Sequence, residues 1–249
     1  MNGTGCFVTG TGTDVGKTVV TALLLRALRR DGLDAVSMKP VQTGAAPSPD
    51  GLRAQDLDVH RAAAGLPEAT QAELALLSPY RYPEACSPHL AGRIAGAYPE
   101  IARIRAAAET LRAQHTAVLV EGAGGIMVPL DESHTMLDLM RALGYPVLLV
   151  AHAGLGTINH TLLSLDALRT AGLEVLGVVL CEPEPLPDDL VKQDNPYAIS
   201  QFGQVPILGC VRHQPRVQPH QPPDFPWDAA MADFTGLGSI LATLRPDGR

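Results

Sequence analysis

The sequence predicts an α/β protein with a doubly wound, mainly parallel sheet and helices on both faces. Apolar runs rich in Val, Ile and Leu alternate with longer segments of helical periodicity. Several runs are apolar at successive positions, which is typical of strands covered on both faces. A strand, a glycine-rich loop and a helix follow one another near the N-terminus. Such units imply right-handed crossovers, so the carboxyl ends of the strands, where these sheets bind ligands, share one edge.

Each element follows from this alternation. The predicted strands are Cys6–Thr9, Ala35–Val41, Ala117–Glu121, Val147–His152, Val175–Cys181 and Val205–Val211. The predicted helices are Lys17–Arg30, Pro99–Gln114, Thr135–Leu143, Thr157–Ala171, about Asp188–Gln201, and a last one near Trp227–Leu244. Gln42–Gln55, rich in Gly, Pro and Ala, is predicted to be a long loop. Residues 213–226 are dense in Pro, Gln and His and are predicted to form a surface excursion before the C-terminal helix. With no clear linker, residues 1–249 are expected to form a single domain.

The composition narrows the function. The chain has 249 residues, of which 46% are hydrophobic and 18% charged, as in a globular protein with a sizeable core. A net charge of −7 disfavours general binding to nucleic acid or to anionic membranes. None of the four cysteines forms a C-x-x-C pair, which argues against a zinc site or a disulfide framework. With no leader pattern or membrane-length apolar stretch, the expected location is cytoplasmic.

The stretch "FVTGTGTDVGKT", Phe7 to Thr18, predicts a phosphate-binding loop. The usual P-loop has four residues between its first Gly and the Gly-Lys pair, but here Gly10 lies one position too early. The loop is therefore one residue longer, and Asp14 lies within it. A strand before the loop and a helix from Lys17 provide the required backbone N–H groups, and Thr18 could bind Mg²⁺. The fold class is accordingly that of P-loop NTPases.

Further polar residues are expected at the same edge of the sheet. Lys39 ends the second strand, and Thr43 follows in the next loop. Glu121 ends a buried strand before a glycine-rich turn, where an acid could complete a Mg²⁺ site with Thr18. Asp56 by itself would be an ordinary helix cap, and the other residues of this edge make it a further candidate metal ligand.

A second helix start could also bind an anion. "GLGTINH", Gly154 to His160, follows a predicted strand and begins a helix. The N–H groups of Gly156 and Thr157, together with the Asn159 amide, could hold a negative group. An ordinary helix cap is an equal alternative for this segment.

Four motifs together resemble dethiobiotin synthetase. "VTGTGTDVGKT", "KPVQTG", "VEGAGG" and "GLGTINH" occur in that family's order and rough spacing, and the extended loop is the family's form. The resemblance covers Phe7 to about Gly209. It implies an enzyme of biotin biosynthesis that closes 7,8-diaminononanoate with CO₂ to dethiobiotin, using ATP and Mg²⁺. It also implies a homodimer whose substrate carboxylate site is shared across the interface.

The resemblance assigns roles to particular residues. Lys39 and Lys17 would be catalytic, by stabilising charge on the carbamate and on the transferring phosphate. Thr18, Asp56 and Glu121 would bind Mg²⁺. Thr43, Gly156, Thr157, Asn159 and Tyr197 would bind the diamine substrate. The ATP site would comprise Thr13, Asp14, Val15, Gly16, Lys17, Thr18, Val19, Asp56, Glu121, Gly122, Ala123, Gly124, Cys181, Glu182, Arg212, His213 and Gln214.

One position departs from the family pattern. Cys181-Glu182 stands where the family commonly has an Asn–Asp pair that contacts adenine, and Cys lacks the paired donor and acceptor of an amide. Weak discrimination between nucleotide bases is therefore expected.

Two other functions are alternatives: another ATP-dependent ligase with the extended loop, and a partitioning-type switch ATPase. A ligase of the cobyrinate amide synthetase type typically carries a glutaminase domain, for which the residues after 210 are too few. A partitioning-type switch ATPase would have a second lysine early in its loop, and positions 10–16 contain none.

Overall fold

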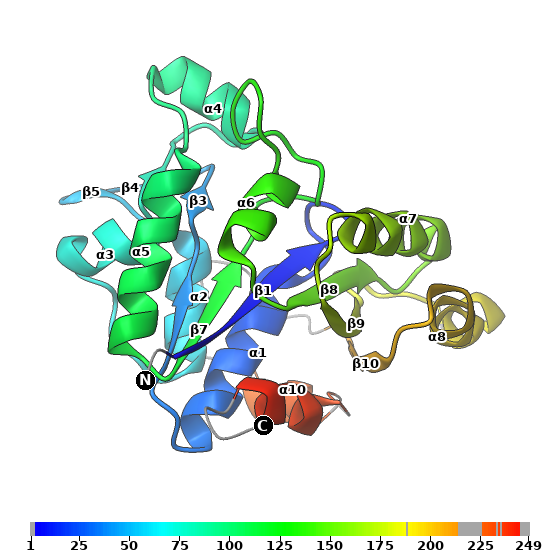
Figure 1. Ribbon diagram of the computed structural model, residues 1–249. Coiled ribbons are helices and arrows are strands. Elements are labelled where there is room, and N and C mark those ends of the chain that lie inside the picture. The colour runs from blue at the N-terminus through cyan, green and yellow to red at the C-terminus, as the bar shows by residue number, and fades with distance from the viewer. Residues whose placement is uncertain (1–2, 188, 214–225, 233, 235, 245–249) are drawn as a thin grey trace.

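The structure is a computed structural model that describes residues 3–187, 189–213, 226–232, 234 and 236–244. Its main sheet has six strands in the order β10-β9-β8-β1-β7-β2, and every neighbouring pair is parallel. The strands are β1 (Thr4–Gly10), β2 (Ala35–Met38), β7 (Ala117–Glu121), β8 (Val147–His152), β9 (Val175–Cys181) and β10 (Ile207–Val211). The predicted doubly wound parallel sheet is confirmed (Figure 1).

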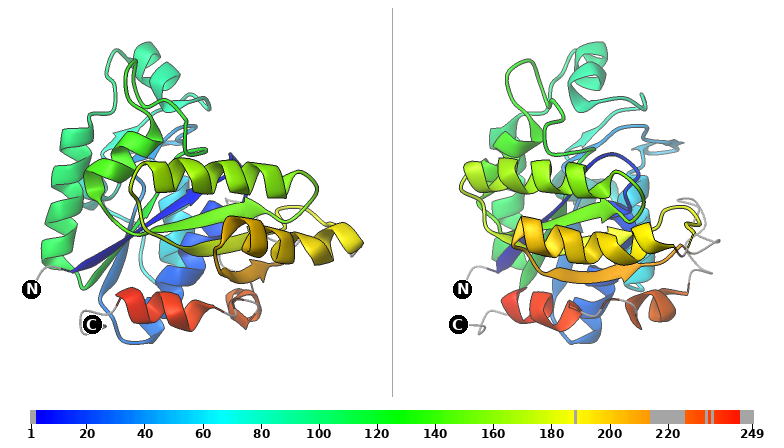
Figure 2. Two further views of the ribbon diagram at one scale, coloured as in Figure 1. Left: turned by 45° about the vertical axis from the view of Figure 1, so that its right-hand side comes forward. Right: turned by 90° about the vertical axis from the view of Figure 1, so that its right-hand side faces the viewer.

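Helices cover both faces of this sheet. One face carries α1 (Lys17–Arg30), α2 (Gln55–Ala63), α9 (Trp227–Ala232) and α10 (Leu237–Leu244). The other carries α5 (Ile101–Gln114), α6 (Met136–Leu143), α7 (Thr157–Thr170) and α8 (Leu190–Gly203). Figure 2 shows α7 and α8 running side by side, and α10 beside the lower end of α1. None of the described helices is long and apolar enough to cross a lipid bilayer.

The hydrophobic core divides into two clusters, one on each face of the sheet. Strand β1 supplies both clusters, because successive side chains of a strand point to opposite faces. Cys6 and Val8 pack against α1, whereas Phe7 belongs to the cluster under α5, α6 and α7. All three side chains are fully buried. The run of successive apolar residues in β1 therefore reflects burial on both faces, as the sequence indicated.

The predicted strand Ala35–Val41 is wrong in its second half. Strand β2 ends at Met38, and β3 (Val41–Gln42) pairs with β6 (Tyr80–Arg81) in a separate small sheet. Pro40 lacks a backbone N–H and cannot extend the ladder, and the Lys39 N–H donates to the Leu77 carbonyl instead. The chain therefore leaves the main sheet at Lys39, which places this side chain at the ligand edge.

The segment between β2 and α5 contains more structure than the sequence indicated. The predicted loop Gln42–Gln55 holds β4 (Pro47–Ser48) and β5 (Gly51–Leu52), which form an antiparallel pair. Three helices here have no counterpart among the predicted ones: α2, α3 (Gln71–Leu77) and α4 (Pro88–Ala95). These helices have nine, seven and eight residues, too few to show a clear apolar period.

The C-terminal part differs from the single helix expected near Trp227–Leu244. Two helices, α9 and α10, are separated by a break before Leu237. The Gly236 N–H donates to the Leu208 carbonyl, and a Cβ at position 236 would lie 2.8 Å from Leu208 backbone atoms. Close approach to β10 therefore stops the helix here. The expected excursion at 213–226 lies outside the described residues, apart from His213 and Pro226.

Candidate active site

The glycine-rich loop between β1 and α1 ends in a left-handed residue. Gly16 has a φ of 97°, and a Cβ there would lie 2.7 Å from the Sγ atom of Cys181, so only glycine fits. Asp14 also has a positive φ, of 58°, and its side chain is exposed. Helix α1 has no side-chain cap. Its first N–H groups are therefore available to an anion, as in a phosphate-binding loop.

Lys17, the first residue of α1, is buried beneath this loop. Its Nζ atom donates to the carbonyl of Gly12 at 2.6 Å. Burial lowers the pKa of Lys17 to about 8, and repulsion from Lys39 adds to that effect. The two lysines thus form a cationic pair at the carboxyl edge of the sheet.

Lys39 joins two carboxylates at the edge of the sheet. Its Nζ atom lies 2.7 Å from Oδ2 of Asp56 and 2.6 Å from Oε1 of Glu121, and it also donates to the Gly122 carbonyl. Burial alone would lower the pKa of Lys39, but attraction from the two carboxylates outweighs it and raises that pKa. Burial likewise would raise the pKa of Glu121, but Lys39 and then His60 hold it below its usual range. Lys39 and Glu121 are therefore both charged at neutral pH.

Thr18, Asp56 and Glu121 form a set of oxygen donors that fits Mg²⁺. The Thr18 hydroxyl donates to Oε1 of Glu121 at 3.0 Å, the oxygen that Lys39 also contacts. No group of three or more His, Cys, Asp or Glu residues suited to a metal occurs in the described part of the chain. Mg²⁺ needs no such cage, because it usually takes one or two carboxylates and completes its shell with water and phosphate oxygens.

These residues line one cavity of about 800 Å³. The predicted site residues on its wall are Thr13, Asp14, Gly16, Lys17, Thr18, Val19, Lys39, Thr43, Asp56, Glu121, Ala123, Gly124, Cys181, Glu182, Arg212 and His213. Val15 packs in the core below the loop, and Gly122 contributes its carbonyl to Lys39. Gln214 lies outside the described residues. Five strand ends and the loops after them thus converge on one space.

The cavity wall near β9 and β10 carries a thiol and a carboxylate at the positions where the family commonly has an Asn–Asp pair that contacts adenine. The Cys181 side chain is buried against Gly16, and burial raises the pKa of its thiol. Glu182 is also buried, with Oε1 at 2.8 Å from Nζ of Lys192. The Sγ atom of Cys210 contacts the same oxygen at 3.7 Å. A carboxylate held by a lysine therefore occupies the part of the cavity where the resemblance implies adenine.

The residues expected to bind the substrate carboxylate lie elsewhere. Gly156, Thr157, Asn159 and Tyr197 do not line the cavity described above. Gly156 precedes α7 with a φ of 91° and no side-chain cap, and Asn159 is exposed. The buried Asn195 of α8 donates to the carbonyls of Ala153 and Gly154, which holds the turn before α7 against α8. Gly156, Thr157 and Asn159 therefore lie together at the start of α7, and Tyr197 lies on α8, all of them apart from the cavity that Thr43 and Lys39 line.

Several site residues have no counterpart among the predicted ones. Gln42, Cys86 and Ser87 line the cavity near Thr43. His60 is fully buried on α2, with Nε2 2.7 Å from Oε2 of Glu121. His60 follows Asp56 by four residues, which is the spacing of two residues on one helix face. That spacing could have identified His60 only if helix α2 had been predicted.

The fold and the loop define the chain as a P-loop NTPase. A model of the AAA domain family matches residues 4–221. The ATP-dependent dethiobiotin synthetase of Anaeromyxobacter dehalogenans (strain 2CP-C) is 47% identical over 96% of this chain and 97% of its own length. That of Anoxybacillus flavithermus is 39% identical over 84% and 91%, respectively. The chain belongs to the dethiobiotin synthetase family.

Solved structures agree with this fold. The cell division ATPase MinD of Pyrococcus furiosus has a TM-score of 0.57 and 18% identity, with 97% of this chain and all of that chain covered. A chain of the MinC:MinD cell division protein complex of Aquifex aeolicus has a TM-score of 0.62 and 13% identity, with 96% of this chain and 95% of that chain covered. At such low identity the likeness shows the fold alone. It therefore does not favour the switch ATPase considered above.

Proposed function

We propose that this protein is an ATP-dependent dethiobiotin synthetase. It closes the ureido ring of dethiobiotin from 7,8-diaminononanoate and CO₂ and releases ADP and phosphate. The observation that carries the proposal is that the phosphate-binding loop and the Lys39–Asp56–Glu121 cluster line one cavity. Relatives of that name align along nearly the whole chain. The switch ATPase and the amide synthetase have no comparable support.

The chemistry requires positioned charges and no side-chain nucleophile. One amine of the substrate and CO₂ form a carbamate, whose oxygen attacks the γ-phosphorus of ATP, and ADP leaves. The second amine then attacks the carbonyl carbon of this mixed anhydride, the ring closes, and phosphate leaves. Each step moves negative charge within a small region, where the fixed cations Lys17 and Lys39 stabilise it. Thr43, on the same wall, is placed to contact the diamine or its carbamate.

The same cavity would hold the cofactor Mg²⁺. Thr18, Asp56 and Glu121 would hold the ion, which when bound neutralises charge on the phosphate oxygens of ATP. Because Lys39 contacts both carboxylates, it fixes their positions before any ligand binds, and it holds the pKa of Glu121 below its usual range.

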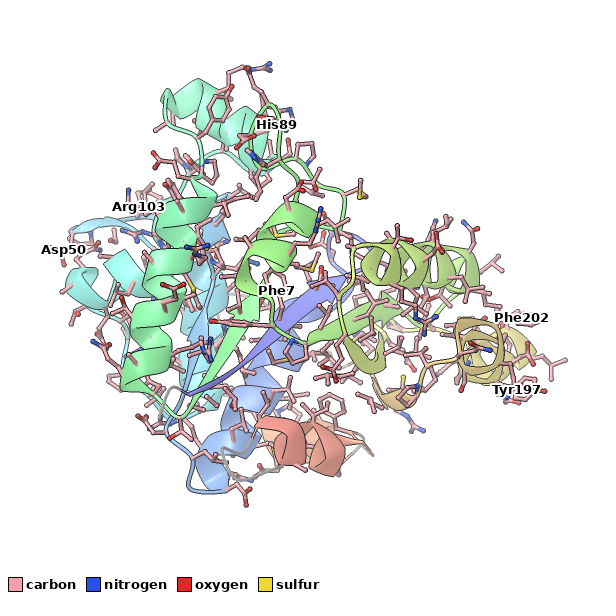
Figure 3. All side chains as sticks on the ribbon, in the orientation of Figure 1. Phe7, Asp50, His89, Arg103, Tyr197 and Phe202 are labelled. Atoms are coloured by element: carbon pink, nitrogen blue, oxygen red, sulfur yellow. The ribbon has the colours of Figure 1, made fainter. Side chains whose placement is uncertain are left out.

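We also propose a homodimer in which α7 and α8 form the interface. Large apolar side chains are exposed on these helices and in the turn before α7: Leu155, Leu163, Tyr197 and Phe202 are between 62% and 88% exposed. Figure 3 shows Tyr197 and Phe202 projecting outward at the end of the molecule formed by α8. A contact there would bring the α7 turn of one protomer to the cavity of its partner. The substrate carboxylate could then bind the N–H groups of Gly156 and Thr157 and the Asn159 amide.

The proposed cellular location and the proposed partners rest on the sequence and on the free cysteine thiols. The four cysteines are free, which suits the reducing cytoplasm. The net charge of −7 supports small-molecule substrates rather than nucleic acid or membrane partners.

The decisive experiment measures product and nucleotide together. The protein is incubated with ATP, Mg²⁺, ¹⁴C-bicarbonate and 7,8-diaminononanoate, and dethiobiotin and ADP are quantified. One ADP is expected for each dethiobiotin, because one phosphoryl transfer activates each carbamate. ATP hydrolysis is expected to fall to background without the diamine. Rapid phosphate release that does not depend on the diamine would favour a switch ATPase instead.

A further inference from the structure

The buried histidine of α2 contacts the carboxylate at the centre of the site. His60 is completely inaccessible to solvent, and its Nε2 atom lies 2.7 Å from Oε2 of Glu121. Asp56, one helical turn earlier, contacts Lys39. Helix α2 therefore contributes two side chains to the cluster of Lys39, Asp56 and Glu121: Asp56 contacts Lys39, and His60 contacts Glu121. His60 itself does not line the cavity.

The two oxygens of Glu121 have separate partners. Oε1 accepts from the Thr18 hydroxyl and from Nζ of Lys39, both of which line the cavity. Oε2 is bound to His60, behind the cavity wall. The last torsion of a Glu side chain is soft, so its carboxylate turns easily unless both oxygens are held. The contact with His60 is what holds the second oxygen.

The tautomer of His60 follows from hydrogen-bond accounting. An ionised carboxylate only accepts hydrogen bonds, so Nε2 must carry the proton in this pair. Nδ1 is buried and has no hydrogen-bond partner. A proton on Nδ1 as well would leave a buried N–H unpaired, which costs more than an unpaired lone pair. Nε2 is therefore the donor to Glu121, and Nδ1 has no hydrogen-bond partner among the described residues.

We infer that His60 is a positioning residue that aims Oε1 of Glu121 at Thr18 and Lys39. This inference rests on the proposed function. In this role His60 contacts neither the nucleotide nor the substrate and acts only through Glu121. Loss of a group that orients a metal-binding carboxylate typically lowers metal affinity or activity by about 10- to 100-fold.

Three substitutions of His60 distinguish the loss of its hydrogen bond to Glu121 from the loss of its packing. Gln places its amide N–H at a reach similar to that of histidine Nε2, the Asn amide falls short of Glu121, and Leu fills the space without any donor. His60→Gln is expected to keep kcat and the Mn²⁺ affinity of the ADP complex within about threefold of the wild type. His60→Asn and His60→Leu are expected to lose roughly 10- to 100-fold in both. The KM for the diamine should not change, because the substrate contacts are intact.

The Mn²⁺ affinity is measured from the paramagnetic resonance signal of free Mn²⁺ in the presence of ADP, so it does not depend on turnover. His115→Leu is the matched control. It removes another histidine–carboxylate pair, with Nδ1 3.0 Å from Oδ2 of Asp34, that does not line the cavity. Its kcat and Mn²⁺ affinity should equal those of the wild type. Thermal unfolding of each variant shows that the comparison is made on folded protein.

Equal losses for Gln and Asn, or wild-type values for Leu, would overturn the inference. A ¹⁵N NMR spectrum of the wild-type protein labelled with ¹⁵N-histidine adds a test that does not depend on whether the variants fold. The His60 ring should carry a proton on Nε2, and a ring with its proton on Nδ1 and none on Nε2 would also refute the inference. If the wild type formed no dethiobiotin, the proposed function would fail, while the Mn²⁺ and NMR results would still decide the role of His60.

Discussion

Nζ of Lys39 lies 2.6 Å from Oε1 of Glu121, and the two side chains are only 5% and 1% exposed. The lysine comes from the point where the chain leaves β2, and the glutamate ends the neighbouring strand β7. A buried ion pair is weak support for stability in itself, but removal of one partner leaves an uncompensated buried charge. The pair therefore couples the integrity of the fold to that of the active site.

Lys39→Ala is expected to reduce both turnover and stability. Loss of one fixed cation at the transition state costs on the order of 3 kcal/mol, or about a hundredfold in kcat. Breaking the buried pair costs a further 3–5 kcal/mol or so in the free energy of unfolding. Steady-state kinetics at a temperature where the variant is folded, together with denaturant unfolding, measure the two effects.

The matched control for Lys39 is Arg105→Ala, which removes an exposed cation paired with Glu109 on α5. Both kcat and the unfolding free energy of this control should stay near wild type. A folded Lys39→Ala variant with normal turnover would remove Lys39 from the catalytic group.

Nucleotide binding should weaken above about pH 8. Burial and the neighbouring Lys39 lower the pKa of Lys17 to about 8 in the free protein. The side chain is therefore cationic below that pH and neutral above it, and a neutral lysine attracts phosphate less. The Kd for ADP, measured calorimetrically from about pH 7 to about pH 9.5, should rise across this window. Lys17→Arg keeps its charge throughout, so its Kd should stay flat; a flat wild-type profile would contradict the assignment.

Asn159→Ala should raise the KM for the diamine far more than the KM for ATP. In the proposed dimer Asn159 holds a carboxylate remote from the reacting amines, so the phosphate site is unaffected. Ser164→Ala, which alters a half-buried residue further along α7, is the control and should change neither constant. If the KM for ATP rises instead, the start of α7 serves the nucleotide and the substrate assignment is wrong.

Nucleotide selectivity should be weak. Cys181 packs against Gly16 and offers no amide, and the Glu182 carboxylate is held by Lys192. A site without a buried hydrogen-bonding pair discriminates poorly, while the loop still binds the triphosphate. CTP, GTP and UTP should support dethiobiotin formation at a kcat/KM within roughly tenfold of ATP, or about 1.4 kcal/mol. Parallel initial rates test this, and a preference for ATP beyond about a hundredfold would reveal base recognition by other groups.

The sequence predicted the six main strands because their apolar runs are set by local composition. It also predicted the extended loop, whose glycines and lysine lie within a short stretch. It missed α2, α3 and α4, since these short helices are stabilised by packing against other elements rather than by a long apolar period. The division of the last helix at Gly236 likewise depends on contact with Leu208, a residue distant in the sequence. The single domain at residues 1–249 stays a prediction.

The sequence by itself determined the class of fold, the phosphate loop and the identities of Lys39 and Glu121 as ligand-edge residues. These follow from the ends of apolar runs, which any parallel sheet places at one edge. Only the tertiary structure decided how the charges pair: Lys39 between two carboxylates, and His60 behind Glu121. Such pairing depends on distances of a few ångströms between helices and strands that are remote along the chain, and sequence spacing does not encode those distances.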